Sequence, residues 1–380
     1  MESTEARPTR IFHLITKANW GGAQVYVQSL IQGSYAMNAE CTLIYGIKGA
    51  LLESLPNIPH IHIPTLERNV RILGDVKTLW SLYTLFKKER PDVVHLHSSK
   101  ASVIGSIAAR LAHCPRIVFT AHGWPYNELR PWWQKSIFYF LSWCAVAASH
   151  VTICVSHAVH AQSPYFLHKK KLRTIHNGVS SVPLFSKENS LKELGIHIEK
   201  KMHIFGSIGE LHPNKGFDIL IRSFALLHKK HQNTHLSIIG EGESRALLEK
   251  YIYVEKLENA ITLHGYIKNA REYIHAFNTF ILPSRTEALG YVLLEAGLAK
   301  IPCIATQVGG IPEIIHQKET GLLVSHTDVR ELCAAMEYAL LHTTIMHTYA
   351  DSLFRKVSSE YTENEMLKKT YALYSTPKNS

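Results

Sequence analysis

The hydrophobic pattern of the first 180 residues alternates between two periods. Short apolar runs rich in β-branched residues, which are typical of buried strands, are separated by stretches in which apolar residues recur at helical spacing. The runs that predict strands are 10–16, 41–45, 93–96, 116–120, 151–155 and 172–175. The stretches that predict helices are 21–30, 75–89, 102–112, 132–148 and a segment after residue 155. This alternation predicts right-handed βαβ units and a parallel sheet.

The alternation stops at 181–201, a polar stretch that predicts a linker with a short helix, and then restarts. The second set of predicted strands is 203–208, 236–239, 261–263, 279–282 and 303–305. The second set of predicted helices is 216–228, 243–255, 269–277, a buried helix from about 289, and final helices within 328–373. The second half therefore repeats the α/β pattern of the first.

Two halves of this kind predict an α/β protein with two Rossmann-like domains that face a central cleft. We assign 1–180 to the N-terminal domain, 181–201 to the linker and 202–355 to the C-terminal domain. Residues 356–380 are expected to form a C-terminal helix. We also consider that this helix crosses back and packs on the N-terminal domain.

One segment approaches the length of a transmembrane helix. Residues 137–155 carry no formal charge, but polar residues interrupt the segment from Ser142 onward, and 151–155 is β-branched. We therefore prefer a buried helix that ends near Ser149 and is followed by a core strand.

The composition is that of an ordinary globular protein, with 46% hydrophobic and 19% charged residues, but the net charge is +10. The basic clusters at 87–88, 169–171, 200–201 and 229–230 flank helical patterns, which favours solvated helix ends. An affinity for phosphate-rich partners or an anionic membrane is the alternative interpretation. No nucleic-acid-reading motif accompanies the charge, so we expect no nucleic-acid partner.

The cysteines indicate the cellular compartment. The six cysteines form no close pairs and mostly lie in apolar runs, so we expect reduced core thiols. The first ten residues are polar and do not resemble a secretory signal. A cytoplasmic location is therefore expected, and the aromatic and basic residues of 124–143 suggest peripheral contact with the inner face of the membrane. A helix packed into the first domain explains 124–143 equally well.

The strongest chemical signal is a pair of carboxylates eight residues apart, Glu287 and Glu295. Glu287 falls on a strand-to-helix connection, at the edge where open α/β sheets bind ligands. Glu295 lies at most ~12 Å further along the helix. The backbone amides after Leu289, those of Gly290 and Tyr291, fall at the helix N-terminus and suit a diphosphate. The stretch predicts a site for an anionic, hydroxyl-rich ligand.

Other candidate residues also follow predicted strands. Gly21 and Gly22 follow the first strand and would let a phosphate or sugar approach the backbone, although a tight turn explains them equally well. Lys215 precedes a helix and could neutralise a diphosphate, or it could be a solvated loop residue. His122 ends a strand of the first half. The patterns His60-Ile-His62 and His95-Leu-His97 place paired imidazoles on a strand face, but neither carboxylate nor cysteine completes a metal site.

The order of these pieces resembles glycosyltransferase family 4, a large family of retaining enzymes with the GT-B fold. The resemblance covers nearly the whole chain, and its most specific part is the E-x7-E motif within 283–296. The stretches 301–313, 155–156 and 177–179 are also similar to the family. The region around His122-Gly123-Trp124 looks like members that build capsular or exopolysaccharide units on lipid carriers.

The resemblance implies roles for individual residues. Glu287 and His122 would be the catalytic residues beside the donor sugar, and Glu295 would hold the ribose. Lys215 would clamp the diphosphate with the amides of Gly290 and Tyr291. Leu289, Gly21 and Gly22 would also belong to the donor-binding residues.

Two further positions complete the implied donor site. Tyr266 and Ile267 would border the nucleobase. The family usually has arginine where this chain has Glu210, and Arg285 and Arg245 are the cations considered as substitutes.

We therefore expect a retaining glycosyltransferase that moves a hexose or N-acetylhexosamine from a nucleoside-diphosphate sugar, with a UDP-linked donor expected, to a saccharide or polyprenyl-linked acceptor. The resemblance implies no metal and no other cofactor. The alternatives are a UDP-sugar 2-epimerase of the same fold and a catalytically silent subunit of a polysaccharide assembly complex. The acidic Glu210 keeps the silent subunit open as an alternative. A nicotinamide dehydrogenase is disfavoured because the G-x-G-x-x-G fingerprint is missing.

Overall fold

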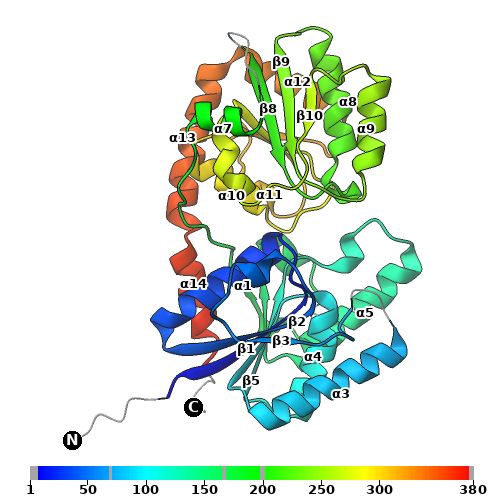
Figure 1. Cartoon of the computed structure of the whole chain (residues 1–380), viewed down its shortest axis with the longest axis vertical. Coiled ribbons are helices and arrows are strands. Elements are labelled where there is room, and N and C mark those ends of the chain that lie inside the picture. The colour runs from blue at the N-terminus through cyan, green and yellow to red at the C-terminus, as the bar shows by residue number, and fades with distance from the viewer. Residues whose placement is uncertain (1–6, 68–70, 165–167, 197–201, 376–380) are drawn as a thin grey trace, which may run out of the picture. The chain divides into compact units, whose positions relative to one another are not determined.

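The computed structural model describes residues 7–67, 71–164, 168–196 and 202–375. These residues form two compact units, each with its own parallel sheet (Figure 1). Unit 1 comprises Met1–Asn177 and Glu363–Ser380, and unit 2 comprises Gly178–Thr362. The basic pair at 200–201 lies outside the described residues.

Unit 1 contains a seven-stranded parallel sheet in the order β3-β2-β1-β4-β5-β6-β7. Its strands are β1 (Thr9–Lys17), β2 (Ala39–Ile47), β3 (His60–His62), β4 (Val93–Leu96), β5 (Arg116–Ala121), β6 (Val151–Cys154) and β7 (Leu172–Thr174). Its helices are α1 (Gly22–Gly33), η1 (Ser34–Met37), α2 (Ala50–Glu53), α3 (Ile72–Glu89), α4 (Ser99–Leu111), η2 (Pro125–Asn127), α5 (Trp132–Ala148), α6 (His157–Ala161), η3 (Lys169–Lys171) and α14 (Glu363–Ala372). Because the strand order reverses at β1, helices cover both faces of the sheet.

Unit 2 contains a six-stranded parallel sheet in the order β10-β9-β8-β11-β12-β13. Its strands are β8 (His203–Ile208), β9 (Thr234–Ile239), β10 (Ile261–Leu263), β11 (Thr279–Leu282), β12 (Cys303–Thr306) and β13 (Leu322–Val324). Its helices are α7 (Lys187–Glu193), η4 (Pro213–Lys215), α8 (Phe217–His228), α9 (Arg245–Val254), η5 (Ala270–Ala276), α10 (Tyr291–Leu298), α11 (Ile311–Ile314), α12 (Val329–Leu341) and α13 (Thr343–Glu360). The strand order reverses between β8 and β11, which makes their carboxyl ends the ligand-binding edge.

The prediction of two Rossmann-like α/β sheets is confirmed. Because helices cover both faces of the sheet, every residue of β8 and β11 is buried, including the polar His203, Ser207 and Thr279. Strand β13 was missed, and the helix expected over 269–277 is the 3₁₀ helix η5. Within 181–201, α7 packs against η5 of unit 2.

The predicted helix end near Ser149 and the core strand after it, β6, are confirmed, but the prediction that the helix is buried is wrong. Helix α5 ends at Ala148 as expected, but its buried residues are Ser142, Ala145 and Val146, all in the C-terminal half. An apolar composition could not distinguish a covered helix from an exposed one. In the described part of the chain, no helix is both long enough and apolar enough to span a membrane.

The core of unit 1 contains a group of buried imidazoles under α1 and α14. Nδ1 of His13 lies 3.0 Å from Nε2 of His97. The two ring nitrogens of His95 lie 2.7 Å from the hydroxyls of Tyr374 and Thr120. The C-terminal segment is therefore held to the sheet through polar contacts as well as apolar ones.

The ring nitrogens of His13, His95 and His97 lie within 4.8 Å of one another, close enough for a metal site, but their surroundings argue against one. The rings of His95 and His97 lie only 4.0 Å apart between centroids, with their planes tilted by 42°. Both nitrogens of His95 already have hydroxyl partners, and no carboxylate joins His13, His95 and His97 in the described cluster. A divalent cation there would be buried without an anionic ligand, which is unfavourable. We interpret the group as a neutral hydrogen-bonded core.

Burial keeps the imidazoles uncharged. It lowers the pKa of His13 to about 3 and that of His95 and His97 well below the ordinary 6.5. Positive potential from neighbouring imidazoles lowers the pKa of His95 and His97 further. The folded protein therefore does not take up protons that the unfolded chain binds below pH ~6.5.

We predict that the free energy of unfolding falls as the pH is lowered from about 7 toward 4. Each such histidine contributes a slope of up to ~1.4 kcal/mol per pH unit, because the unfolded state binds the proton and the folded state does not. His13→Leu should flatten the slope measured by urea unfolding at several pH values. His326→Gln, a change at an exposed histidine, is the control. An unchanged slope in His13→Leu would contradict the prediction.

Candidate functional site

The candidate site of unit 2 lies where β8 and β11 end side by side. Lys215 ends η4, which follows β8, and Glu287 follows β11. Nζ of Lys215 lies 2.6 Å from Oε2 of Glu287, and the hydroxyl of Ser284 donates to the same oxygen at 3.3 Å. The Lys215 and Glu287 side chains are 28% and 15% exposed, so ligand can still reach the pair. The structure thus brings together the two residues expected to act on the sugar and on the diphosphate.

The loops that carry this pair are held by close backbone contacts. The amide of Arg285 donates to the carbonyl of Asn214 at 2.7 Å and joins the two loops. Gly216 and Gly309 have positive φ angles of 68° and 51°. A Cβ at Gly309 would lie 1.7 Å from the carbonyl oxygen of Glu287. Glycine is required there because the backbone approaches too closely for any side chain.

The helix after Glu287 begins as predicted. Gly290 is the N-cap of α10 with φ 99°, and Tyr291 is its first residue. Leu289 and Tyr291 are buried, which fixes the start of the helix against the unit 2 core. Backbone amides at this end carry a partial positive charge that suits a phosphate.

Glu295 lies one turn further along α10 and lines a small cavity. The cavity measures about 60 Å³ and is lined by Ser180, Ser181, Val182, Leu184, Arg271, Glu295 and Leu298. Burial raises the pKa of Glu295 to about 7, although Arg271, 3.8 Å away, favours the ionised form. A carboxyl group in a cavity whose pKa lies near 7 can, when ionised, accept hydrogen bonds from hydroxyl groups of a ligand.

The other cations near the site already have carboxylate partners. Arg285 donates two hydrogen bonds to Asp218 at 2.8 and 2.6 Å. Burial opposes ionisation of Asp218, but the pair with Arg285 lowers the pKa of Asp218 overall. Arg245 pairs with Glu241 and Glu249. Both arginines are therefore engaged by carboxylates in this structure, as Lys215 is by Glu287, and neither is a free cation in place of the arginine expected at position 210.

The residues expected beside the nucleobase lie on the same edge. Gly240 follows β9 and Gly265 follows β10, and the two glycines form an isolated bridge. Tyr266 is 55% exposed and Ile267 is half-buried. Their exposure leaves them accessible to a planar ligand, and the structure adds no contact that assigns them a role.

Three predicted residues belong to unit 1. Gly21 is the N-cap of α1 and Gly22 its first residue. His122 follows β5, and its ring meets that of Tyr26 edge-on at 5.0 Å between centroids. Burial lowers the pKa of His122 to about 3, so the ring is neutral. Among the described residues, no group hydrogen-bonds to the buried Nε2 of His122. An unsatisfied buried nitrogen of this kind can bind a substrate hydroxyl or a water molecule.

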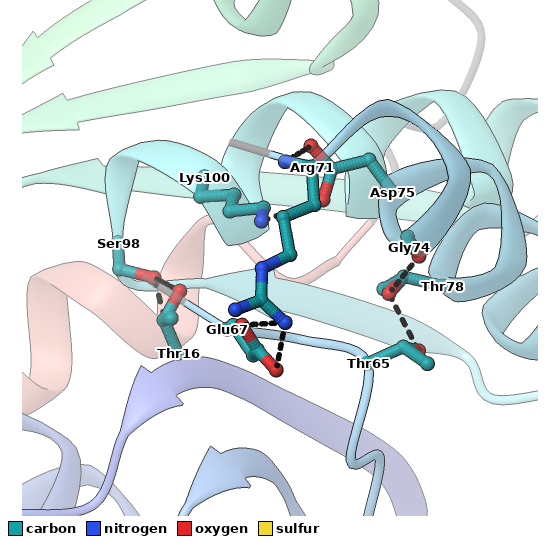
Figure 2. A network of polar contacts seen from close by, with 9 residues as sticks. All are labelled: Thr16, Thr65, Glu67, Arg71, Gly74, Asp75, Thr78, Ser98 and Lys100. Carbon is teal, nitrogen blue, oxygen red and sulfur yellow. Dashed lines mark hydrogen bonds and ion pairs between the residues drawn. The ribbon is translucent and has the colours of Figure 1, made fainter. Parts of the chain in front are cut away.

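Sequence reasoning missed a polar network at the same edge of unit 1, which Figure 2 shows. Lys100 in the first turn of α4 pairs with Asp75 in the first turn of α3, with 2.5 Å between Nζ and Oδ1. The hydroxyls of Thr16 and Ser98 lie 2.7 Å apart and join the ends of β1 and β4. The sequence carried no signal for these contacts, since each joins residues distant along the chain.

Two family models match the chain and together cover most of it. The model described as "Glycosyl transferases group 1" matches residues 189–351, and the model described as "Glycosyltransferase Family 4" matches residues 20–181. The first contains the Lys215–Glu287 pair and the second contains Gly21, Gly22 and His122. The first match spans all six strands of the unit 2 sheet, and the second spans β2 to β7 of the unit 1 sheet.

Curated relatives are similar over much of their length. An Escherichia coli protein named UDP-Gal:alpha-D-GlcNAc-diphosphoundecaprenol alpha-1,3-galactosyltransferase is 29% identical over 286 residues, or 72% of this chain and 73% of the relative. The Staphylococcus aureus capsular polysaccharide biosynthesis glycosyltransferase CapM is 23% identical, over 83% of this chain and 84% of the relative.

Solved structures establish the fold class. The structure of Anabaena Alr3699/HepE in complex with UDP and glucose superposes with a TM-score of 0.81 at 18% identity. The match covers 96% of this chain and 98% of that one. At this identity the similarity shows a shared GT-B fold and does not transfer a ligand.

We predict that Gly309→Ala destabilises unit 2 more than Gly195→Ala does. Both glycines have positive φ, so each substitution imposes a comparable backbone strain, of order 1–3 kcal/mol. A Cβ at Gly309 also collides with the backbone of Glu287, whereas a Cβ at Gly195 meets nothing within 4 Å. Thermal unfolding of both variants measures the difference. Equal melting temperatures would show that the Glu287 loop is not held in this way.

Proposed function

Because this chain belongs to the group 1 and family 4 glycosyltransferases, we propose that it transfers a hexose or N-acetylhexosamine from a nucleoside-diphosphate sugar to a saccharide acceptor. We propose a UDP-linked donor, since the E. coli relative is named for UDP-galactose and the Anabaena structure holds UDP and glucose. The acceptor class that we propose is a lipid-linked saccharide of a surface polysaccharide, as the names of the E. coli and S. aureus relatives suggest.

The observation that carries this proposal is the Lys215–Glu287 pair at the β8–β11 edge, 2.6 Å apart beside the start of α10. We propose that the donor diphosphate takes over Lys215, with the amides of Gly290 and Tyr291 as further donors. Glu287, freed from the lysine, then accepts hydrogen bonds from the sugar hydroxyls. Glu295, in its cavity beside Arg271, would hold the ribose.

The proposed reaction keeps the configuration at the anomeric carbon. The acceptor oxygen attacks from the face that the diphosphate leaves, so the new C–O bond forms as the bond to the phosphate breaks. The proton of the acceptor hydroxyl passes to the departing phosphate oxygen. Lys215 and the backbone amides offset the charge that develops on the diphosphate, a task that requires no bound metal. His122 is proposed to contact the sugar through its unpaired Nε2.

We predict that Lys215→Ala and Glu287→Gln each lower the rate of sugar transfer by about 100-fold or more, because each removes a group that acts as charge develops. Both variants should remain folded, since the pair is partly exposed. Lys250→Ala, at an exposed lysine of α9, is the matched control and should keep full activity. Full activity in both site variants would refute the assignment of the site.

We predict that UDP-sugars raise the melting temperature and that GDP- and ADP-sugars raise it less. A donor present at ~100 times its dissociation constant stabilises the native state by ~2.7 kcal/mol. The shift should be unchanged by a metal chelator and should be lost in Lys215→Ala. A shift that disappears with the chelator would contradict the metal-free mechanism. Anomeric NMR signals of the product report whether the configuration is retained.

A further inference from the structure

Two helices of unit 1 expose large apolar side chains to solvent. On α3, Leu73 is 81% exposed and Trp80 is 67% exposed. On α5, Trp132 is 79% exposed and Phe140 is 60% exposed. Removing apolar surface of this size from water is favourable, so such faces mark sites of interaction.

The apolar residues of α3 form a stripe that points away from the core. At about 100° per residue, Leu73, Val76 and Trp80 lie on one side of the helix. The buried residues Thr78 and Leu82 lie on the opposite side. The helix therefore has apolar residues on two faces, of which the sheet covers one.

The exposed residues of α3 and α5 lie at the same end of unit 1. Each helix leads back to the start of the next strand, so its N-terminal half lies beside the carboxyl ends of the strands. Helix α4 packs between α3 and α5, and the three helices cover one face of the sheet (Figure 1). The exposed apolar residues cluster in the N-terminal halves, at the edge that also carries His122 and Gly22.

The start of α3 is held in this orientation by polar contacts. The Lys100–Asp75 pair joins the first turns of α4 and α3, and the two side chains are only 13% and 20% exposed. The hydroxyl of Thr78 lies 2.7 Å from that of Thr65 (Figure 2). Because these inward contacts fix the helix, Leu73 and Trp80 cannot turn into the core.

The unpaired charges beside the two apolar stripes are positive, because Asp75 of α3 pairs with Lys100 and Glu128, just before α5, pairs with Arg130. Lys77 is exposed within the α3 stripe, and Lys135 borders the aromatic residues of α5. No carboxylate in the described parts of the chain pairs with either lysine. The whole chain carries a net charge of +10. Apolar and aromatic residues bordered by unpaired lysines fit an anionic lipid surface.

We propose that this aromatic surface, made of Leu73, Val76, Trp80, Trp132, Trp133 and Phe140, docks on an anionic lipid bilayer. The proposal rests on the proposed function, because a lipid-linked acceptor lies in such a bilayer. It adds α3, which the sequence did not single out, and places the contact at the edge where the strands of unit 1 end. A second copy of the chain is a poorer occupant, because a two-fold contact pairs the surface with itself and so offers its lysines no unpaired carboxylate.

Vesicle sedimentation tests the proposal with the full-length chain. The wild type should bind vesicles that contain phosphatidylglycerol and bind phosphatidylcholine vesicles weakly. Leu73→Ser with Trp80→Ser, and separately Trp132→Ser with Trp133→Ser, should each lower binding on the order of tenfold. Lys77→Glu with Lys135→Glu should remove the preference for the anionic lipid. Tyr253→Ser with Val254→Ser, an exposed apolar pair of α9 in unit 2, is the matched control and should bind normally.

Two further measurements separate the possible outcomes. The stabilisation by UDP-sugar should persist in the surface variants, so that failure of donor binding and failure of membrane docking are told apart. Light scattering in solution reports self-association. Wild-type protein that ignores anionic vesicles, or that binds them equally after both apolar double substitutions, overturns the proposal. A dimer that dissociates on the same substitutions, without vesicle binding, overturns it in favour of a second copy.

Discussion

The candidate donor site depends on the close approach of two backbones at the β8–β11 edge. Gly309 contacts the carbonyl of Glu287, and Gly216 contacts the carbonyl of Pro283, each where no Cβ could fit. These contacts hold the Glu287 loop against the loop that carries Lys215. The ion pair follows from this packing, since a lysine and a glutamate in mobile loops would stay hydrated and apart. The chemistry we propose thus relies on two glycines that touch no substrate.

The local features of the fold were predictable because they depend on local patterns. The apolar runs identified the two parallel sheets, and the spacing of Glu287 and Glu295 placed the first at a strand end and the second on α10. The N-terminal amides of Gly290 and Tyr291 follow from the same spacing. What remained out of reach were contacts between distant segments, such as the Lys215–Glu287 pair, separated by 72 residues.

Burial was harder to predict than secondary structure. The composition of α5 suits a covered helix, yet Trp132 and Phe140 are exposed. The apolar pattern in the sequence of one helix does not show whether another part of the protein packs against that helix. The imidazoles show the reverse case. His95 lies on an apolar strand, but its partner Tyr374 is 279 residues away, so the hydrogen bond that makes its burial tolerable cannot be recognised from the sequence.

The return of α14 to unit 1 has a consequence for the order in which the protein folds during synthesis. Unit 2 is continuous in the chain, from Gly178 to Thr362, whereas unit 1 requires residues on both sides of it. The ribosome therefore releases all of unit 2 before the segment that hydrogen-bonds to His95 and Tyr26. Until then, His95 of β4 and Tyr26 of α1 lack these hydrogen-bond partners. Unit 1 therefore stays incomplete on the nascent chain while unit 2, which is synthesised after most of unit 1, can already fold.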